Sequence, residues 1–301
     1  MSLEGQKILV TGPTSQVAFP LAAQLARDNE VIGLARFTRD GERERVEKIG
    51  VTPLAADLAS DDLASLPDDF DYVLHFAVVK SGDFEYDLAA NAEGLGRLMH
   101  HCRRARAFLH VSSAAVYETK EGLAAEADPL GDNHRVMMPT YSICKIAAEV
   151  VARLCARQLE LPTTIARFSV PYGDNGGWPW YHLLMMKAGQ PIPVHPDGPN
   201  RFNLIHEDDY IAQVPRLLEI AGVPPTVVNW GGPEASIEEW CAYLGELTGL
   251  EAKLQQTEQT LHALPLDLER MHQLVGPARV GWRDGVRRMV AARNPELLRP
   301  S

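Results

Sequence analysis

The alternation of short apolar runs with amphipathic helical stretches is the feature that most constrains this fold. Residues 8–10 form an apolar run that ends at Thr11-Gly12-Pro13, and residues 31–35 form a second run. The stretch between them has helical spacing, with apolar side chains at Val17, Leu21 and Leu25. Residues four apart share one face of a helix, whereas short continuous apolar runs indicate buried strands. The chain therefore opens with a predicted parallel strand–helix–strand unit.

The same alternation continues well into the chain. Further apolar runs lie at 51–54, 72–77, 108–111 and 163–167, with helical stretches between them. The run at 72–77 is apolar throughout, which is typical of a strand covered by helices on both faces. These runs predict an α/β fold built on a doubly wound parallel Rossmann sheet.

The composition of the sequence changes after Tyr172. Proline and glycine are dense from 173 to 199, and the last third mixes helical stretches with short strands such as 227–230. We interpret this part as a smaller C-terminal substrate lobe that is partly interwoven with the sheet. The predicted domains are a dinucleotide-binding Rossmann domain at 1–172 and a substrate-binding lobe mostly within 173–301, with some segments returning to the sheet domain.

Charge and cysteine content exclude several other classes of protein. The formal net charge of −11 argues against binding to nucleic acid or to an anionic membrane. The four cysteines have no CxxC or Cys/His spacing, so we expect reduced thiols and no metal site. The N-terminal residues lack a signal-peptide pattern, and no uncharged apolar run has membrane-spanning length. We therefore expect a cytoplasmic protein that acts on a small-molecule substrate.

A tyrosine and a lysine in the helical stretch after residue 140 point to chemistry. Tyr141 and Lys145 are four residues apart, so they lie on one helical face, one turn apart. A nearby ammonium favours the phenolate of a tyrosine, and such a pair can move a proton near neutral pH. Chance alone supplies about 0.2 such pairs in a chain of this composition, so the pair gains its meaning from its context.

The loop after the first apolar run has the pattern of a dinucleotide site. A loop that leaves a buried strand and enters a helix presents free N–H groups to a pyrophosphate. The glycine fingerprint places glycines at three positions, which here hold Gly12, Ser15 and Ala18. Alanine is accepted at the third position, and Ser15 is the weaker match.

The end of the second predicted strand discriminates between cofactors. A ribose-binding acid belongs about 20 residues after the glycines, and Ala35 stands there, followed by Arg36 with Arg39 nearby. A guanidinium pairs with a 2′-phosphate, whereas a carboxylate repels it. This position therefore favours NADP, with NAD as the alternative.

Together these residues resemble the extended short-chain dehydrogenase/reductase family, which contains nucleotide-sugar epimerases and dehydratases. The resemblance covers nearly the whole chain, with the motifs in the family's order. It is carried by Thr11-Gly12, Asp57-Leu58, His75-Phe76-Ala77, Asn91-Ala92-Glu93-Gly94, Ser113 with Tyr117, Glu126-Ala127-Asp128-Pro129, Tyr141 to Lys145, Arg167 with Tyr172-Gly173, Ile205-His206-Glu207-Asp208-Asp209 and Val280-Gly281-Trp282.

The resemblance implies roles for individual residues. Tyr141 would be the general acid/base, Lys145 would hold the nicotinamide ribose and depress the pKa of Tyr141, and Ser113 would orient the substrate oxygen. It also implies a homodimer formed through the helices after Asn91 and around Tyr141. The cofactor contacts that we predict are Gly12, Thr14, Ser15, Gln16, Val17, Arg36, Asp57, Leu58, Phe76, Ala77, Lys145 and Val170. The substrate contacts that we predict are Val78, Ser113, Ala114, Tyr141, Trp178, Tyr181 and Arg201, and we expect His182 at the surface.

Departures from the family pattern leave the substrate open. Val170 stands where nucleotide-sugar members carry asparagine, and the interval from Arg201 to His206 is one residue longer than usual. The presumed substrate side is rich in apolar and aromatic residues, which suits a flat apolar ligand. We therefore predict an NAD(P)-dependent oxidoreductase that transfers hydride at a carbonyl or alcohol carbon of a small, largely apolar substrate. The alternatives are a nucleotide-sugar epimerase, dehydratase or reductase, and a non-catalytic dinucleotide-binding regulator, against which the intact catalytic set argues.

Overall fold

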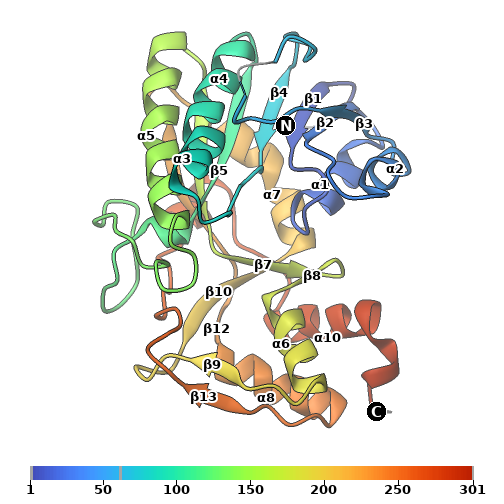
Figure 1. Ribbon diagram of the computed structural model, residues 1–301, viewed down its shortest axis with the longest axis vertical. Helices are drawn as coiled ribbons and strands as arrows, with labels where there is room; N and C mark the ends of the chain where they lie inside the picture. The colour runs from blue at the N-terminus through green and yellow to red at the C-terminus, as the bar shows by residue number, and fades with distance from the viewer. Residues whose placement is uncertain (1–2, 61–62, 300–301) are drawn as a thin grey trace.

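The fold is described for residues 3–60 and 63–299 of a computed structural model. The sheet and its helices form one layered body, and a smaller lobe lies beneath it (Figure 1). Residues 1 and 301, the outer ends of the two predicted domains, lie outside the described ranges. Within these ranges no helix is both long enough and apolar enough to cross a membrane.

A seven-stranded sheet, parallel throughout, forms the larger body. Its strand order is β11-β6-β5-β4-β1-β2-β3, so the chain winds outward in both directions from the centre. This confirms the predicted doubly wound sheet. The strands are β1 (Lys7–Thr11), β2 (Glu30–Ala35), β3 (Thr52–Ala55), β4 (Tyr72–His75), β5 (Ala107–Ser113), β6 (Thr163–Phe168) and β11 (Thr226–Trp230).

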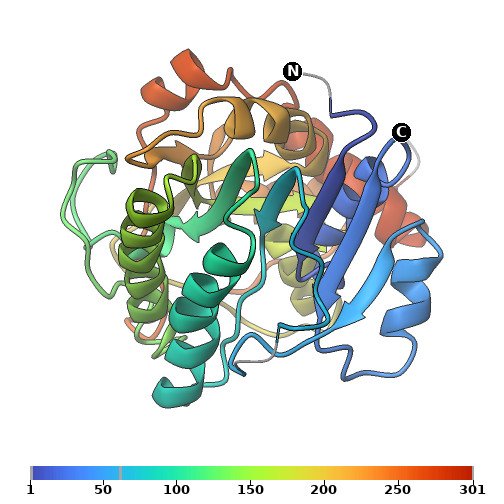
Figure 2. The same cartoon turned by 90° about the horizontal axis from the view of Figure 1, so that it is seen from above.

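Helices cover both faces of this sheet. One face packs against α1 (Ala18–Leu25), α7 (Glu207–Glu219) and α9 (Glu269–Leu274). The other packs against α4 (Gly94–His101) and α5 (Tyr141–Leu159), visible together on one side in Figure 2. The strands alternate their side chains between these two apolar cores, which is why they read as continuous apolar runs in the sequence. The remaining helical elements near this sheet are α2 (Glu42–Glu47), α3 (Phe84–Leu88), a π turn (Ala89–Glu93) and a 3₁₀ turn (Ala114–Val116).

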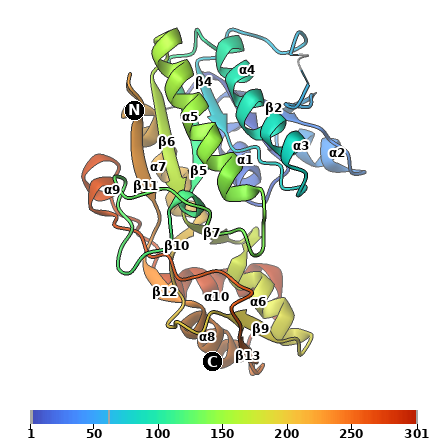
Figure 3. The ribbon, with the colours of Figure 1, turned by 60° about the vertical axis from the view of Figure 1, so that its left-hand side comes forward.

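The lower lobe has its own apolar core, formed around two small sheets (Figure 3). The first sheet has the order β12-β10-β7-β8, and the second pairs β13 with β9. The lobe's strands are β7 (Val170–Gly173), β8 (Gly176–Gly177), β9 (Ile192–Val194), β10 (Arg201–His206), β12 (Glu234–Ser236) and β13 (Leu254–Gln256). Its helices are α6 (Trp178–Lys187), α8 (Ile237–Thr248), α10 (Trp282–Arg293) and the 3₁₀ turn Pro295–Leu297.

Two segments of the last third return to the large sheet. Strand β11 pairs with β6 as its outermost strand, and α7 packs on the face that α1 also covers. The lobe is thus interwoven with the sheet, as the sequence predicts. A domain boundary at residue 172 stays a prediction.

A fully buried ion pair fixes α5 to the sheet. Arg167 on β6 and Glu149 on α5 are each 1% exposed, and two guanidinium nitrogens of Arg167 donate to the two carboxylate oxygens at 2.9 and 2.8 Å. The Ser112 hydroxyl of β5 donates to the same carboxylate at 2.6 Å, and Arg167 also donates to the Glu126 carbonyl oxygen at 3.0 Å. Bidentate geometry and extra hydrogen bonds are what let such a pair survive burial.

Breaking this ion pair should cost much of the protein's stability. Arg167→Met leaves the Glu149 carboxylate buried without its partner, so we expect the free energy of unfolding to fall by about 3–5 kcal/mol in urea denaturation. Arg43→Met is the matched control, because its pair with Glu47 is exposed, and it should change stability by less than about 0.5 kcal/mol. Similar small losses for both variants would contradict the assignment.

Candidate active site

Three predicted catalytic residues meet where β5 ends and α5 begins. Ser113 is the last residue of β5, Tyr141 opens α5, and Lys145 lies one turn further along. The Ser113 hydroxyl hydrogen-bonds the Tyr141 phenol. The Lys145 ammonium, which is buried, donates to the carbonyl oxygen of Val111 on β5 at 2.8 Å. The three functional groups therefore share one corner at the carboxyl edge of the sheet, where doubly wound proteins bind ligands.

The electrostatics of this corner differ from the expectation in one respect. Burial raises the pKa of Tyr141, and the hydrogen bond from Ser113 opposes that shift. The predicted depression of this pKa by Lys145 is absent, because the ammonium is directed to the strand carbonyl and desolvation of the phenolate dominates. Burial and the charge of Lys80 lower the pKa of Lys145 to about 8, against the opposing charge of Glu149.

Two residues that the sequence analysis missed flank the tyrosine. The Lys80 ammonium lies 5.4 Å from the centre of the Tyr141 ring, and the His134 ring centre lies 5.8 Å from it. Burial, reinforced by Lys80, lowers the pKa of His134 to about 4, so its imidazole is neutral at pH 7. Both residues come from loops, after β4 and before α5, where no periodicity or motif marks them.

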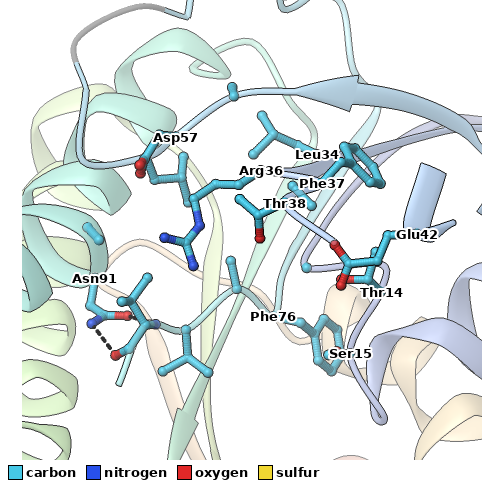
Figure 4. Close-up of a pocket in the computed structure, with 18 of the residues that line it drawn as sticks. Thr14, Ser15, Leu34, Arg36, Phe37, Thr38, Glu42, Asp57, Phe76 and Asn91 are labelled. Atoms are coloured by element: carbon cyan, nitrogen blue, oxygen red, sulfur yellow. Dashed lines mark hydrogen bonds between the residues drawn. The ribbon is translucent and has the colours of Figure 1, made fainter. Parts of the chain in front are cut away.

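A cleft at the ends of β1, β2 and β4 contains the predicted dinucleotide loop (Figure 4). Gly12 has a φ of +71°, and a Cβ there would lie 3.2 Å from the Ala77 Cα, so the turn requires glycine. The Ser15 hydroxyl accepts a hydrogen bond from the Ala18 amide at 3.1 Å, at the start of α1. This cradle is open to a pyrophosphate in the way that the dinucleotide fingerprint requires.

The cleft contains most of the predicted cofactor residues. Those that line it are Gly12, Thr14, Ser15, Arg36, Asp57, Leu58, Phe76 and Ala77. Gln16 and Val17 turn instead toward the lower lobe and α7, where the Gln16 amide donates to the Gly176 carbonyl and the Val17 carbonyl accepts from Tyr210. Lys145 and Val170 lie outside the lining, on α5 and on β7.

Arg36 extends into the cleft on the Asp57 side (Figure 4). Its guanidinium donates to the Tyr86 hydroxyl at 2.7 Å, and that hydroxyl donates to the Asp57 carboxylate at 2.9 Å. Glu42 at the start of α2 also lines the cleft, beside Thr14 and away from Asp57 (Figure 4), so the cleft carries two carboxylates as well as the guanidinium. Tyr86 and Glu42 are further residues that the sequence analysis did not select.

The predicted substrate residues are divided between the cleft and the lower lobe. Val78 lines the cleft, and Ala114 is buried in the 3₁₀ turn after Ser113. Trp178 is half-buried and packs against Phe202 with ring centres 5.0 Å apart. Tyr181 is 54% exposed. Trp178 and Tyr181 both belong to α6 of the lower lobe, and their substrate role stays a prediction.

The substrate role of Arg201 stays a prediction, whereas the burial of His182 contradicts the expectation for that residue. Arg201 begins β10 with an exposed side chain that pairs with Glu234 at 2.6 Å, and the next residue, Phe202, takes the inward position. His182, expected at the surface, is buried and accepts a hydrogen bond from the Trp240 indole at 2.8 Å. Burial lowers the pKa of His182 to about 4.

The fold and the cleft define a dinucleotide-binding α/β enzyme. The model of the NAD dependent epimerase/dehydratase family matches residues 8–231, and the chain belongs to that family. It is an NAD-dependent enzyme of the epimerase/dehydratase type. This confirms the family resemblance and the oxidoreductase class that the sequence analysis predicts.

Curated relatives are plant enzymes of nucleotide-sugar metabolism. The trifunctional UDP-glucose 4,6-dehydratase/UDP-4-keto-6-deoxy-D-glucose 3,5-epimerase/UDP-4-keto-L-rhamnose-reductase RHM2 of Arabidopsis thaliana is 27% identical over 327 residues, which cover 97% of this chain and 48% of the relative. RHM3 of the same plant, which has the same description, is 26% identical over 329 residues, again 97% and 48%. The chain spans about half the length of the curated relatives it matches.

Solved structures share the fold. The UDP-glucuronic acid 4-epimerase from Bacillus cereus, in complex with UDP-glucuronic acid and NAD, matches with a TM-score of 0.81 and 22% identity over 95% of this chain and 98% of the other. The dTDP-glucose 4,6-dehydratase DesIV from Streptomyces venezuelae, with NAD and TYD bound, gives a TM-score of 0.81 and 22% identity over 96% and 97%.

The pKa of Lys145 gives a pH dependence of stability. The pKa of Lys145 is about 8 in the folded protein, compared with the ordinary value of 10.5 in the unfolded chain. Between these two pH values the unfolded chain binds more protons than the folded chain, so stability rises with pH there. From about pH 7 to about pH 10 the wild type should gain on the order of 2 kcal/mol relative to Lys145→Met. Urea denaturation at several pH values measures this difference, in which tyrosine titration common to both proteins cancels. Parallel pH profiles would show that Lys145 is not desolvated.

Proposed function

We propose that this chain acts on a nucleotide sugar, oxidising or reducing one sugar carbon, as an epimerase, dehydratase or reductase. The observation that carries the proposal is the hydrogen-bonded Ser113–Tyr141 pair at the carboxyl edge of the sheet, beside a cleft with a glycine turn. The relatives and solved neighbours whose names or titles state UDP- or dTDP-sugars support the substrate class. The proposed chemistry agrees with the predicted hydride transfer. The proposed substrate is the alternative that the sequence analysis gave, in place of the small apolar molecule of its main prediction.

The residues of the cleft fit a nicotinamide dinucleotide. The Gly12 turn leaves no room for a side chain against Ala77, and the amide groups that follow it lead into α1. Thr14 and Ser15 would meet the pyrophosphate, and Asp57 and Leu58 would meet the adenosine end. When bound there, the dinucleotide accepts a hydride from a carbon or returns one to it.

Tyr141 and Ser113 would handle the oxygen attached to that carbon. In oxidation of an alcohol, the Tyr141 oxygen takes the hydroxyl proton while the Ser113 hydroxyl holds the substrate oxygen. In reduction of a ketone, Tyr141 returns the proton. The Lys145 ammonium, anchored on the Val111 carbonyl oxygen, would lie on the nicotinamide ribose side.

The arrangement of the lower lobe favours the nucleotide-sugar reading over the apolar one. Of the aromatic side chains that suggested an apolar ligand, Trp178 packs against the core of the lower lobe and Tyr181 is mostly exposed. Lys80 places a positive charge beside Tyr141, where an anionic diphosphate would benefit from it. A neutral apolar substrate would gain nothing from that charge.

Replacing the acid/base tests the proposed function. Tyr141→Phe should keep its fold and its bound dinucleotide. Its turnover should fall by about 10²- to 10⁴-fold, because the lost phenol is the group that exchanges the proton with the substrate oxygen. The measurements are the dinucleotide released on denaturation, thermal shifts with UDP- and dTDP-sugars, and product analysis. Tyr243→Phe, a change of the same size in the lower lobe, should leave turnover unchanged. Full activity in Tyr141→Phe would refute the role, and no thermal response to any nucleotide sugar would refute the substrate class.

We also propose that the site binds NADP, on the basis of the position of Arg36. Its guanidinium lies at the adenosine end, where a 2′-phosphate would replace Tyr86 as its partner. Arg36→Ala should therefore weaken NADP binding about tenfold or more while NAD binding changes little, as titration calorimetry would measure. Equal losses for both cofactors would mean that Arg36 only supports the bridge through Tyr86 to Asp57.

A further inference from the structure

Two histidines and an aspartate meet in the lower lobe, away from the dinucleotide cleft. His195 and Asp197 follow strand β9, and His262 lies in the segment 257–268 between β13 and α9. One potential ligand atom of each residue lies within 4.8 Å of the others. His262 joins the other two only through the fold, so the sequence offers no local spacing that would predict the cluster.

The three side chains lie close together, but they do not satisfy one another's hydrogen-bonding groups. The two imidazole ring centres are 3.7 Å apart. His195 is 6% exposed, and its Nδ1 accepts a hydrogen bond of 3.2 Å from the Asp197 amide. The Asp197 carboxylate lies 3.6 Å from that Nδ1, too far for a hydrogen bond. Two imidazoles in ring contact, with a carboxylate beside them that makes no hydrogen bond to His195, form a donor set suited to a borderline divalent metal.

The spacing fits a tetrahedral centre. Bonds of about 2.1 Å to zinc at tetrahedral angles separate two ligand atoms by about 3.4 Å. The 3.6 Å between the His195 Nδ1 and the Asp197 carboxylate is close to that separation, and binding through this nitrogen would replace the hydrogen bond of 3.2 Å that it accepts from the Asp197 amide. The longest separation that the cluster permits is 4.8 Å, so closure requires about 1.4 Å of movement or less. The Asp197 side chain is 81% exposed and free to make that movement.

We propose that His195, Asp197 and His262 bind a divalent cation of the zinc type, with water completing its coordination. The cation would join the loop after β9 to the segment 257–268. That segment touches the loop before Tyr141, where the Thr260 hydroxyl donates to the Met137 sulfur at 3.8 Å. The metal thus fastens a segment that borders the candidate active site. This inference does not depend on the nature of the sugar substrate, because none of its three ligands lines the cleft.

Metal titration of the full chain tests the proposal. Untagged protein stripped with a chelator should bind one equivalent of Zn²⁺ in titration calorimetry, and its melting temperature should rise on adding the metal. Co²⁺ substituted at the same site should give the intense visible absorption of tetrahedral coordination. In His262→Gln and Asp197→Asn, affinity should fall by about tenfold or more, because each removes one of three protein ligands. His272→Gln, at an exposed histidine of α9, is the matched control and should bind like the wild type.

Three outcomes would overturn the site. The first is a wild-type protein that binds no stoichiometric Zn²⁺. The second is a pair of variants, folded by circular dichroism, that bind it as tightly as the wild type. The third is equal weakening in His272→Gln, which would identify adventitious surface binding only. Because Asp197 is exposed, Asp197→Asn separates loss of a ligand from loss of folding even if the histidine variant is unstable.

Discussion

The geometry of the site depends on one buried ion pair. Arg167 on β6 and Glu149 on α5 join the sheet to this helix, and Ser112 of β5 donates to the same carboxylate. An uncompensated charge in this core would be costly, so α5 cannot rotate or slide on the sheet without losing the pair. Ser113 follows Ser112 directly, and Tyr141 and Lys145 stand on the helix that Glu149 anchors. The hydrogen bond between Ser113 and Tyr141 is therefore set by a contact that takes no part in chemistry.

The larger fold was predictable because its strands are buried on both faces. Each apolar run in the first half became a strand within one or two residues, and the spacing of Val17, Leu21 and Leu25 anticipated α1. The sheet partner was harder to predict for the strand at 227–230. Its apolar character predicts a strand, but pairing with β6 is decided by a contact across some sixty residues of chain, and loop closure leaves no mark in local sequence.

The site was predictable where a residue is tied to the end of a regular element. Ser113 and Tyr141 follow from the end of a strand and the start of a helix, and Gly12 from a turn with positive φ. Loops carry no such period, so Lys80, His134 and Tyr86 were missed. The substrate role of Arg201 stays a prediction. Its side chain is exposed and pairs with Glu234, while strand alternation gives Phe202 the inward position.

The return of β11 to the edge of the large sheet limits how the two halves can move. This strand follows much of the lower lobe in the chain, and α7 next to it also packs on the sheet. The polypeptide therefore passes between sheet and lobe more than once, and each passage resists twisting about a single hinge axis. Movement of the lobe relative to the sheet is expected to be a small shear along the carboxyl edge, distributed over several connections, instead of a wide rotation about one linker.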